Sequence, residues 1–226
     1  MKLLDIFQNR VQIINKSYKN CLLFTLYILD LNREEYKFLS MFLNSEETSK
    51  YKNFTSIEHS KRFTICRVFL KFVLASILQK DISSLHFTYG PNGKPYLSDG
   101  SIFFNISHSK DLCLIGLSFT NEIGVDIEFI DKNIDYRSLL RLFSSKKEIK
   151  WVLERNSIER FYRIWTLKEA ILKYTGQGIS DVGFPKLVIN NKTLLFPDTI
   201  TYSSIIKENY AISLVSAWYR EVVPKN

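Results

Sequence analysis

The sequence predicts an α+β fold made of two halves of similar size. Strand-like and helix-like segments alternate in two blocks, each about 100 residues long, which is an ordinary domain size. The 226 residues are enough to bury a substantial core, and 46% hydrophobic with 24% charged residues excludes a disordered chain. We expect the halves to divide near Thr120, giving residues 1–120 and 121–226, with a poorly defined lead-in over residues 1–20.

The first half begins with a β-branched and aromatic run, Cys21–Leu31, which predicts a buried strand. The polar stretch from Asn32 to about Tyr51 predicts a helix. A longer helix is predicted over Glu58–Gln79, because apolar residues recur there at three- and four-residue steps. The residues of this stripe are Phe63, Cys66, Phe69 or Leu70, Val73 and Ile77, with Lys61, Arg62 and Lys71 off it. Turn-forming residues fill the middle of Phe87–Leu97.

Three strands are predicted next, the third of them beyond the expected division, and two helices follow. The strands are Ile102–Ile106, Leu112–Phe119 and Ile123–Phe129, with a hairpin turn at Asn121 and Glu122. The helices are Lys146–Arg155 and Ile158–Tyr174, the second ending at Gly176. Three short strands are then predicted: Leu187–Ile189, Thr193–Phe196 and Ile212–Trp218.

The chain is basic, with 31 Lys and Arg against 23 Asp and Glu and a net charge of +8. This charge points to a polyanionic partner, such as a nucleic acid, an acidic membrane surface, a phosphorylated small molecule or an acidic protein. The three cysteines Cys21, Cys66 and Cys113 are too scattered for a disulfide framework, so we expect reduced thiols and a cytoplasmic protein. No secretory signal is recognised, and the most apolar stretches are too short to span a bilayer.

Two carboxylates share one face of the strand predicted at Ile123–Phe129. Strand alternation places Asp126 and Glu128 on the same face, opposite to Val125 and Ile127. Like charges two positions apart repel, and a hard divalent cation between them, Mg²⁺ or Mn²⁺, removes the repulsion. Taken alone, the pair is read more simply as a solvated acidic face.

A charged segment lies on the helix predicted at Ile158–Tyr174. Helical spacing places Tyr162, Thr166, Glu169 and Lys173 on one face, with Lys168 about 100° away from Glu169. Glu169 could supply a third carboxylate to a metal, and the two lysines could reach phosphate oxygens. An exposed Glu169–Lys173 pair accounts for the same residues without a ligand.

Two polar segments of the first half offer anion-binding groups. Ser107 and His108 follow a predicted strand, where a hydroxyl, an imidazole and backbone N–H groups can hold a phosphate; a polar turn is an equal alternative. No G-x-S-x-G is present, so a hydrolase triad is not supported. Gly93-Lys94-Pro95 lacks the P-loop pattern. A basic cluster at the start of the long helix comprises Lys50, Lys52, Lys61 and Arg62. Charges of this kind usually form a solvated face.

The order and spacing of these segments are more specific than any one of them. The segments are Gly93-Lys94-Pro95, Phe104 to Ser109, Gly124 to Glu128, Phe143-Ser144 with Glu148, and Trp165 to Ala170 with Lys173. In this order they resemble the surfactin-type 4′-phosphopantetheinyl transferases, over about Tyr51 to Gly178. The extra Pro91-Asn92 before Gly-Lys-Pro departs from the family pattern, as does the lead-in.

The resemblance implies a reaction, a co-substrate and partners. Members of this family move the phosphopantetheine arm of coenzyme A to a serine of an acyl, aryl or peptidyl carrier protein, with Mg²⁺, and release 3′,5′-ADP. They are pseudo-twofold monomers that bind coenzyme A between two similar halves.

The resemblance also implies site residues. Asp126, Glu128 and Glu169 would hold Mg²⁺, and Lys168 and Lys173 would contact the phosphates. The remaining matches are Ser107 and His108 at the adenosine 3′-phosphate, Lys94 and Pro95 at the adenine, Arg62 and Lys50 at phosphate, and Glu148 near the reacting centre. The proton of the carrier serine would pass to Glu169, or to Glu148 through a water.

Three alternative functions fit the sequence less well. A basic nucleic-acid-binding module should carry a motif such as RNP1, and the sequence has none. A catalytically inactive family scaffold is disfavoured because Asp126, Glu128, Lys168 and Glu169 are intact. The short trimeric holo-acyl carrier synthases are about half as long, so the length excludes them.

Overall fold

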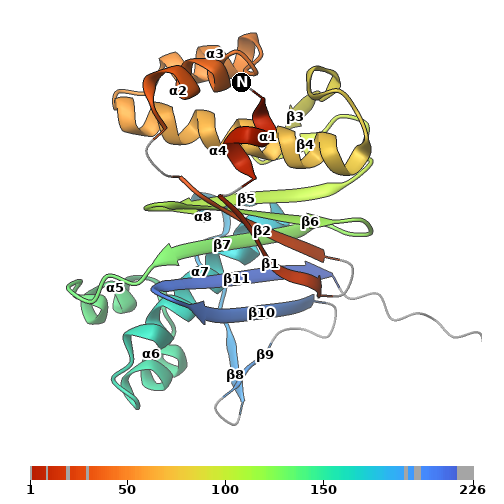
Figure 1. Cartoon of the computed structure of the whole chain (residues 1–226). Coiled ribbons are helices and arrows are strands. Elements are labelled where there is room, and N and C mark those ends of the chain that lie inside the picture. Colours follow the sequence, from red (N-terminus) through yellow and green to blue (C-terminus); the bar gives the residue numbers. More distant parts are fainter. Residues whose placement is uncertain are drawn as a thin grey trace, which may run out of the picture.

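A computed structural model of the chain describes residues 2–8, 10–18, 21–28, 31–190, 193–195 and 200–217. It confirms the predicted α+β class, since helices and strands are mixed along the whole described chain. Two antiparallel sheets pack face to face, and each is covered on its outer face by helices (Figure 1). The predicted end residues Phe196 and Trp218 lie outside the described residues.

The first sheet has four strands, all antiparallel to their neighbours. Across the sheet they are β1 (Val11–Tyr18), β2 (Cys21–Tyr27), β6 (Leu112–Ser118) and β5 (Phe103–Ser109). Every residue of β6 is buried, because one face of this central strand packs on helices and the other on the second sheet. Cys113 and Ile115 face the helices, whereas Leu112 and Leu114 face the second sheet.

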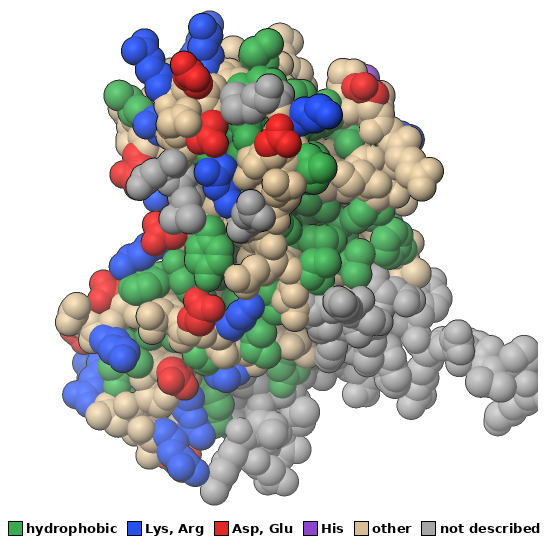
Figure 2. Space-filling view, viewed as in Figure 1, with side chains coloured by type: hydrophobic (Ala, Val, Ile, Leu, Met, Phe, Trp, Pro, Cys, Tyr) green, Lys and Arg blue, Asp and Glu red, His purple; other side chains and the backbone are tan. Residues whose placement is uncertain are grey.

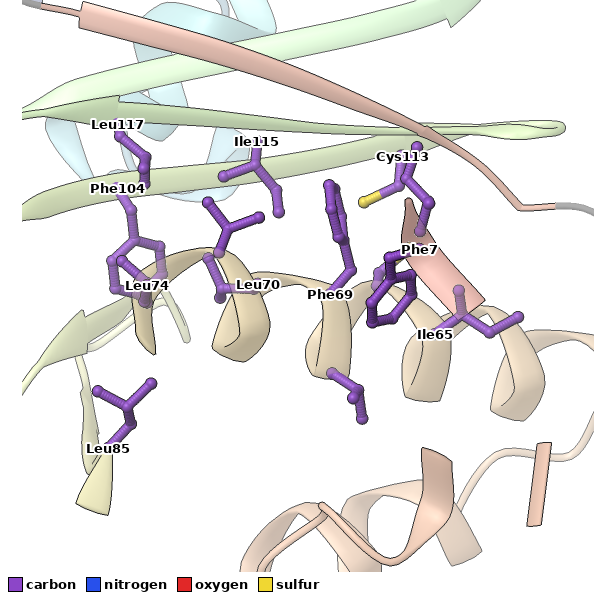
Figure 3. Close-up of a cluster of buried hydrophobic side chains, with 14 of the residues drawn as sticks. Phe7, Ile65, Phe69, Leu70, Leu74, Leu85, Phe104, Cys113, Ile115 and Leu117 are labelled. Carbon is purple, nitrogen blue, oxygen red and sulfur yellow. The ribbon is translucent and has the colours of Figure 1, made fainter. Parts of the chain in front are cut away.

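The helical layer on the first sheet is built around one long helix, α4. The helices are α1 (Leu3–Phe7), α2 (Arg33–Ser40), α3 (Ser45–Lys52) and α4 (Ile57–Leu78), and a single 3₁₀ turn, η1 (Ile82–Ser84), follows. Figure 3 shows Phe69, Leu70 and Leu74 of α4 packed against Phe104 and Ile115 of the sheet. The short hairpin of β3 (Phe87–Tyr89) and β4 (Pro95–Leu97) comes next.

The second sheet has three strands and carries the remaining helices. In order the strands are β10 (Ile200–Lys207), β11 (Tyr210–Ala217) and β7 (Ile123–Phe129). Helix α7 (Ile158–Thr175) packs on its outer face, and α5 (Tyr136–Phe143) and α6 (Lys146–Leu153) pack against α7. Gly176 ends α7 in the left-handed conformation. A short helix, α8 (Ile179–Val182), and a hairpin of β8 (Val188–Asn190) and β9 (Thr193–Leu195) complete this part.

The connection after β6 differs from the prediction. A hairpin turn was expected at Asn121 and Glu122, but β6 and β7 belong to different sheets and share no backbone ladder. The chain crosses here from one sheet to the other, because both faces of β6 are already covered and β6 already has β2 and β5 as neighbours. A division of the chain near Thr120 stays a prediction.

Other predicted elements were wrong in extent. The single helix expected from Asn32 to Tyr51 is two helices, because Asn44 starts a second one by accepting a hydrogen bond from the Glu47 backbone. Lys71 was placed off the buried stripe of α4, yet it is only 3% exposed because it pairs with Glu47. The lead-in contains α1 and β1, and no sequence pattern predicted α5 or β10.

No helix in the described ranges is both long enough and apolar enough to cross a membrane.

Candidate active site

Strands β5 and β7, from different sheets, are joined by side chains. Asn105, Ser107 and Ser109 alternate along β5 and so point to one face. The Asn105 Oδ1 accepts a hydrogen bond from the Val125 backbone (3.0 Å), and the Ser109 Oγ accepts one from the Phe129 backbone (3.0 Å). The Ser107 and Ser109 hydroxyls donate to Asp126 Oδ1 (2.8 Å) and Glu128 Oε2 (2.7 Å). The Ser-His segment thus lies within β5, not after a strand as predicted.

Gly124 allows helix α7 to approach β7 closely. A Cβ at this position would overlap the Ala170 carbonyl oxygen and lie 2.5 Å from the Tyr174 backbone nitrogen. Only glycine fits such an approach. The close packing brings the carboxylates of β7 against the polar face of α7.

Asp126 and Lys173 form the central ion pair of this junction. The Lys173 ammonium donates to Asp126 Oδ1 at 2.7 Å and to Ser107 Oγ at 2.9 Å. Asp126 is 3% exposed, and its second oxygen, Oδ2, is buried with no hydrogen-bond partner among the described residues. Buried carboxylate oxygens are nearly always paired, so this oxygen marks a place for a cation or a donor.

Glu128 and Glu169 lie close enough to Asp126 to feel its charge. Removal from water raises the pKa of Glu128, and the nearby Asp126 carboxylate raises it further. The same two causes, in the same order, raise the pKa of Glu169. The carboxylates of Asp126, Glu128 and Glu169 therefore lie close together, near the Lys173 ammonium.

The face of α7 that meets the site differs from the predicted one. Trp165, Glu169 and Lys173, four residues apart, line the cavity. Tyr162 and Thr166 instead bond inside the second half: the Tyr162 hydroxyl accepts from the Asp131 backbone, and Thr166 shares a hydrogen bond with Ser213. Helical spacing is compatible with either set of residues facing the site. The structure turns the set that begins with Trp165 toward the cavity.

The cavity at this junction has a volume of about 470 Å³. Its lining combines carboxylates, cations and aromatic rings: Lys50, Phe63, Cys66, Arg67, Gly93, Pro95, Ile106, Ser107, His108, Asp126, Glu128, Trp165, Glu169 and Lys173. A second hollow of about 340 Å³ shares Gly93, Pro95, Ile106, Glu169 and Lys173 with it and extends to Gly178 and Ile179. Desolvation lowers the pKa of His108, with smaller contributions from the charges of Arg62 and Lys173.

Two residues expected to contact coenzyme A, Arg62 at a phosphate and Lys94 at the adenine, do not line the main cavity. Arg62 is paired with Glu58 at 2.9 Å and lines a separate hollow together with Lys61 and Lys110. Lys94 is buried and turned toward the second half, where it donates to Glu122 Oε2 (2.7 Å) and to the Tyr174 carbonyl (3.0 Å). The backbone around Lys94 borders the second hollow. The Lys94 ammonium, however, already donates to Glu122 and Tyr174.

Glu148 and Lys168 were expected at the reacting centre, and the structure does not bring them there. They form a buried ion pair at 3.0 Å, with exposures of 0% and 1%. Glu148 also accepts hydrogen bonds from the Ser145 and Leu187 backbones, and Lys168 donates to the Phe143 carbonyl. All charged atoms of this pair are used in tying α6 to α7, so neither side chain lines the cavity.

Sequence reasoning missed several residues of the lining. Phe63 was assigned to the core stripe, and Arg67 and Trp165 were given no role at the site. A signal for Arg67 exists, because it is a lone cation within the apolar run Thr64–Leu70. A buried cation in such a run needs a partner, which is a reason to look for an anion.

Comparison with known proteins gives these residues a family context. A model described as the 4′-phosphopantetheinyl transferase superfamily matches residues 122–218, and one described as 4′-phosphopantetheinyl transferase, N-terminal, matches residues 31–119.

Individual relatives carry the same description. The 4′-phosphopantetheinyl transferase HetI of Nostoc sp. is 33% identical over 159 residues, which cover 67% of each chain. A putative 4′-phosphopantetheinyl transferase of Synechocystis sp. is 39% identical over 144 residues, 61% of this chain and 58% of the relative. The 4′-phosphopantetheinyl transferase Sfp of Bacillus subtilis is 31% identical over 154 residues, 66% of this chain and 67% of Sfp. The protein therefore belongs to the Sfp-type 4′-phosphopantetheinyl transferase family of enzymes.

Proposed function

We propose that the protein transfers the 4′-phosphopantetheine arm of coenzyme A to a serine of an apo acyl, aryl or peptidyl carrier protein. The products are the holo carrier protein and 3′,5′-ADP, and the reaction requires Mg²⁺. The general transferase activity follows from the family, whereas the metal, the leaving group and the acceptor serine are proposals for this chain.

The observation that carries the proposal is the division of charge within one cavity. Asp126, Glu128 and Glu169 supply negative charge from β7 and α7, and Lys50 and Arg67 supply positive charge from α3 and α4. A ligand with several phosphates and a divalent cation matches both parts. The ring of Trp165 and the side chain of Pro95 offer apolar surface beside these charges.

The carboxylates fit a magnesium ion by their chemistry. Within the described residues no three His, Cys, Asp or Glu side chains are arranged as a formed metal site, and Lys173 occupies one oxygen of Asp126. The buried, unpaired Asp126 Oδ2 and the raised pKa values of Glu128 and Glu169 mark a place where added positive charge is favourable. Hard carboxylate oxygens are the ligands Mg²⁺ prefers. When bound, Mg²⁺ neutralises pyrophosphate charge.

The transfer itself is a displacement at phosphorus. The serine oxygen forms a bond to the phosphorus that carries pantetheine, and the bond from that phosphorus to the bridging oxygen breaks. The leaving oxygen departs with both electrons as part of 3′,5′-ADP, and Lys173 is placed to stabilise phosphate charge. Glu169 accepts the serine proton, because it lies at the cavity and Glu148 does not.

The other expected residues take supporting roles in this proposal. Ser107 and His108 contact a phosphate from β5, and Pro95 packs beside the adenine. Lys94 and the Glu148–Lys168 pair act as positioning residues, which hold the β3–β4 turn and helix α7 in place. Arg62 acts at longer range, through its charge.

Mass spectrometry of an apo carrier protein incubated with coenzyme A and Mg²⁺ tests the proposal. We expect a mass gain of one phosphopantetheine, and no gain with Asp126→Ala. Asp99→Ala removes an exposed aspartate that does not line the cavity and serves as the matched control, with full transfer expected. No gain with several carriers would refute the reaction, and full activity of Asp126→Ala would refute the metal assignment.

We further propose that the protein acts as a monomer in the cytoplasm. The three cysteines are buried thiols that form no disulfide, as expected in a reducing compartment, which supports this location. A salt-sensitive complex with random DNA would instead favour a nucleic-acid-binding role. Binding of coenzyme A without transfer to any carrier would favour an inactive scaffold.

A further inference from the structure

The turn between β3 and β4 lies against the end of helix α7. The Asn92 side chain donates from Nδ2 to the Gly176 carbonyl oxygen at 3.0 Å, 84 residues further along the chain, and to Asp181 Oδ2 at 2.8 Å. The Lys94 ammonium, in the same turn, donates to the Tyr174 carbonyl oxygen at 3.0 Å. Two side chains of the turn therefore bond to the segment that ends α7. None of the site residues that the family resemblance implies falls on Asn92.

The Asn92 amide matches its two partners. A carboxamide nitrogen has two N–H donors, and here one bonds to Gly176 and the other to Asp181. Asp181 Oδ2 also accepts from the Gly178 backbone at 3.0 Å, so this carboxylate joins Asn92 to the chain that follows α7. An ionised carboxylate has no donor, so an aspartate at this position could make neither bond.

Other residues of the same turn border the space where a ligand would lie. Gly93 and Pro95 line both the main cavity and the second hollow. Glu169 and Lys173 of α7 line both as well, and Asn92 borders the second hollow. The contacts of Asn92 therefore fix the position of one lining segment, the β3–β4 turn, relative to another, the end of α7.

The two lining segments are not held equally firmly. Helix α7 is held by its close approach to Gly124 of β7 and by the buried pair of Glu148 and Lys168. The two hydrogen bonds of Asn92 are exposed to water. Exposed hydrogen bonds add little to global stability and open easily. Loss of the Asn92 side chain should therefore loosen the turn and leave α7 in place.

We propose that Asn92 is a positioning residue, which holds the β3–β4 turn in place for coenzyme A and so increases the affinity without taking part in the transfer. The inference rests on the proposed function. A segment that is already ordered loses less conformational freedom when a ligand binds, and this increases affinity. Glu169 and Lys173 are positioned by other contacts of α7, so the rate at saturating coenzyme A should not depend on Asn92.

Steady-state transfer and calorimetric titration of coenzyme A, both with Mg²⁺, test the proposal on Asn92→Ala. We expect the KM and the Kd for coenzyme A to rise about 3- to 10-fold, since binding must then order the turn. The value of kcat should stay within about twofold, as it does when only ground-state binding is lost. The melting temperature should fall by less than about 3 °C, because the lost hydrogen bonds are exposed.

Asn121→Ala is the matched control. It removes another amide, which donates to the neighbouring Thr120 and lines neither hollow. We expect this variant to keep the KM, the Kd, kcat and the melting temperature of the original protein.

Exchanging the two side chains separates this role from a general effect on folding. Asn92→Asp sets two carboxylates against each other and should raise the KM more than Asn92→Ala does. Asp181→Asn alone should have little effect, because its amide oxygen can still accept from Asn92 and Gly178. In the double variant a donor again faces an acceptor, so part of the affinity lost in Asn92→Asp should return.

Four results would count against the inference. Unchanged KM and Kd in Asn92→Ala would overturn it while the proposed transfer stands. A fall in kcat together with a melting temperature lowered by more than about 6 °C would show that Asn92 only supports the fold. No recovery in the double variant would contradict the pairing with Asp181. Failure of the unmodified protein to bind coenzyme A at all would refute the proposed function, and the inference with it.

Discussion

At the scale of single residues, the cavity keeps acidic side chains in a partly dehydrated setting. Burial and the Asp126 charge raise the pKa of Glu128, although hydrogen bonds from Ser109 and Trp165 lower it. Glu169 is affected in the same way. In the unliganded enzyme the ionised forms of Glu128 and Glu169 are therefore energetically unfavourable, and a bound cation lowers that energetic cost.

From the raised pKa of Glu128 we predict how the stability of a Glu128→Gln variant compares with that of the original protein at different pH values. Urea unfolding in EDTA measures the difference. A raised pKa in the folded state means that Glu128 favours folding when protonated, and this contribution is lost as the pH rises through that pKa. At pH 7 the variant should thus be more stable than the original protein. Below the ordinary glutamate range both side chains are neutral, and the difference should vanish. A variant that is less stable at pH 7 would contradict the electrostatic origin of the effect.

A second prediction at this scale concerns the buried Glu148–Lys168 pair. Lys168→Met leaves Glu148 charged and fully buried, so the free energy of unfolding should fall by about 3 kcal/mol or more. Lys150→Met, on the exposed side of α6, is the matched control and should change little.

Chemical denaturation and transfer assays together decide the role of Lys168. Reduced stability with transfer retained in the remaining folded protein indicates a positioning role. Unchanged stability with transfer abolished would restore the catalytic role that the family resemblance implied.

At the scale of elements, the site depends on the contact between β7 and α7. Gly124→Ala should push these elements apart, because the added methyl group meets backbone atoms that cannot move aside. We expect a loss of about 1–3 kcal/mol of stability and a larger loss of transfer activity. Thermal unfolding and the carrier assay measure the two effects. Gly90→Ala should change both much less, because its new methyl would lie 3.2 Å from the Tyr96 ring and in ordinary contact with the Lys94 carbonyl oxygen. Equal effects at the two positions would argue against the contact between β7 and α7.

Some elements could be read from the sequence and others could not. The strand Ile123–Phe129 was predicted with its observed bounds, because strong alternation and flanking turn residues mark it. The break within residues 32–51 had a signal that was overlooked: Asn32 and Asn44 are each followed three residues later by glutamate, the pattern of a capping box. The burial of Lys71 had no local signal, since its partner Glu47 lies on another helix.

At the site, the identities of the functional residues were easier to predict than the directions in which their side chains point. The identities of Asp126, Glu128, Glu169 and Lys173 were found from spacing and family resemblance, and the structure brings them together. Which way a side chain points depends on contacts between distant segments. Lys94 and Lys168 are turned away from the cavity by carboxylates that lie 28 and 20 residues away in sequence.

At the scale of the whole molecule, the positive charge lies partly outside the cavity. Figure 2 shows Lys and Arg side chains gathered at the lower left, over α5 and α6. These helices carry Arg137, Arg141, Lys146, Lys147 and Lys150, all exposed. An acidic carrier protein would be attracted by such a surface.

We therefore expect the affinity for an acidic carrier to fall as salt is raised, roughly tenfold between about 0.05 and 0.5 M NaCl. Coenzyme A affinity should change less, because its contacts lie within the cavity and are screened less. Parallel titrations of the two ligands measure this. If both affinities fell equally with salt, all of the charge that affects binding would lie in the cavity.

We propose that one cavity, lined by residues of α4, β5, β7 and α7 among others, carries out the transfer from coenzyme A to a serine. The most direct measurement quantifies 3′,5′-ADP by chromatography and the modified carrier by intact mass in the same reaction. We predict equal molar amounts of both, formed with Mg²⁺ and neither formed in EDTA or with Asp126→Ala. Release of 3′,5′-ADP without carrier modification, or modification that persists without a divalent metal, would contradict it.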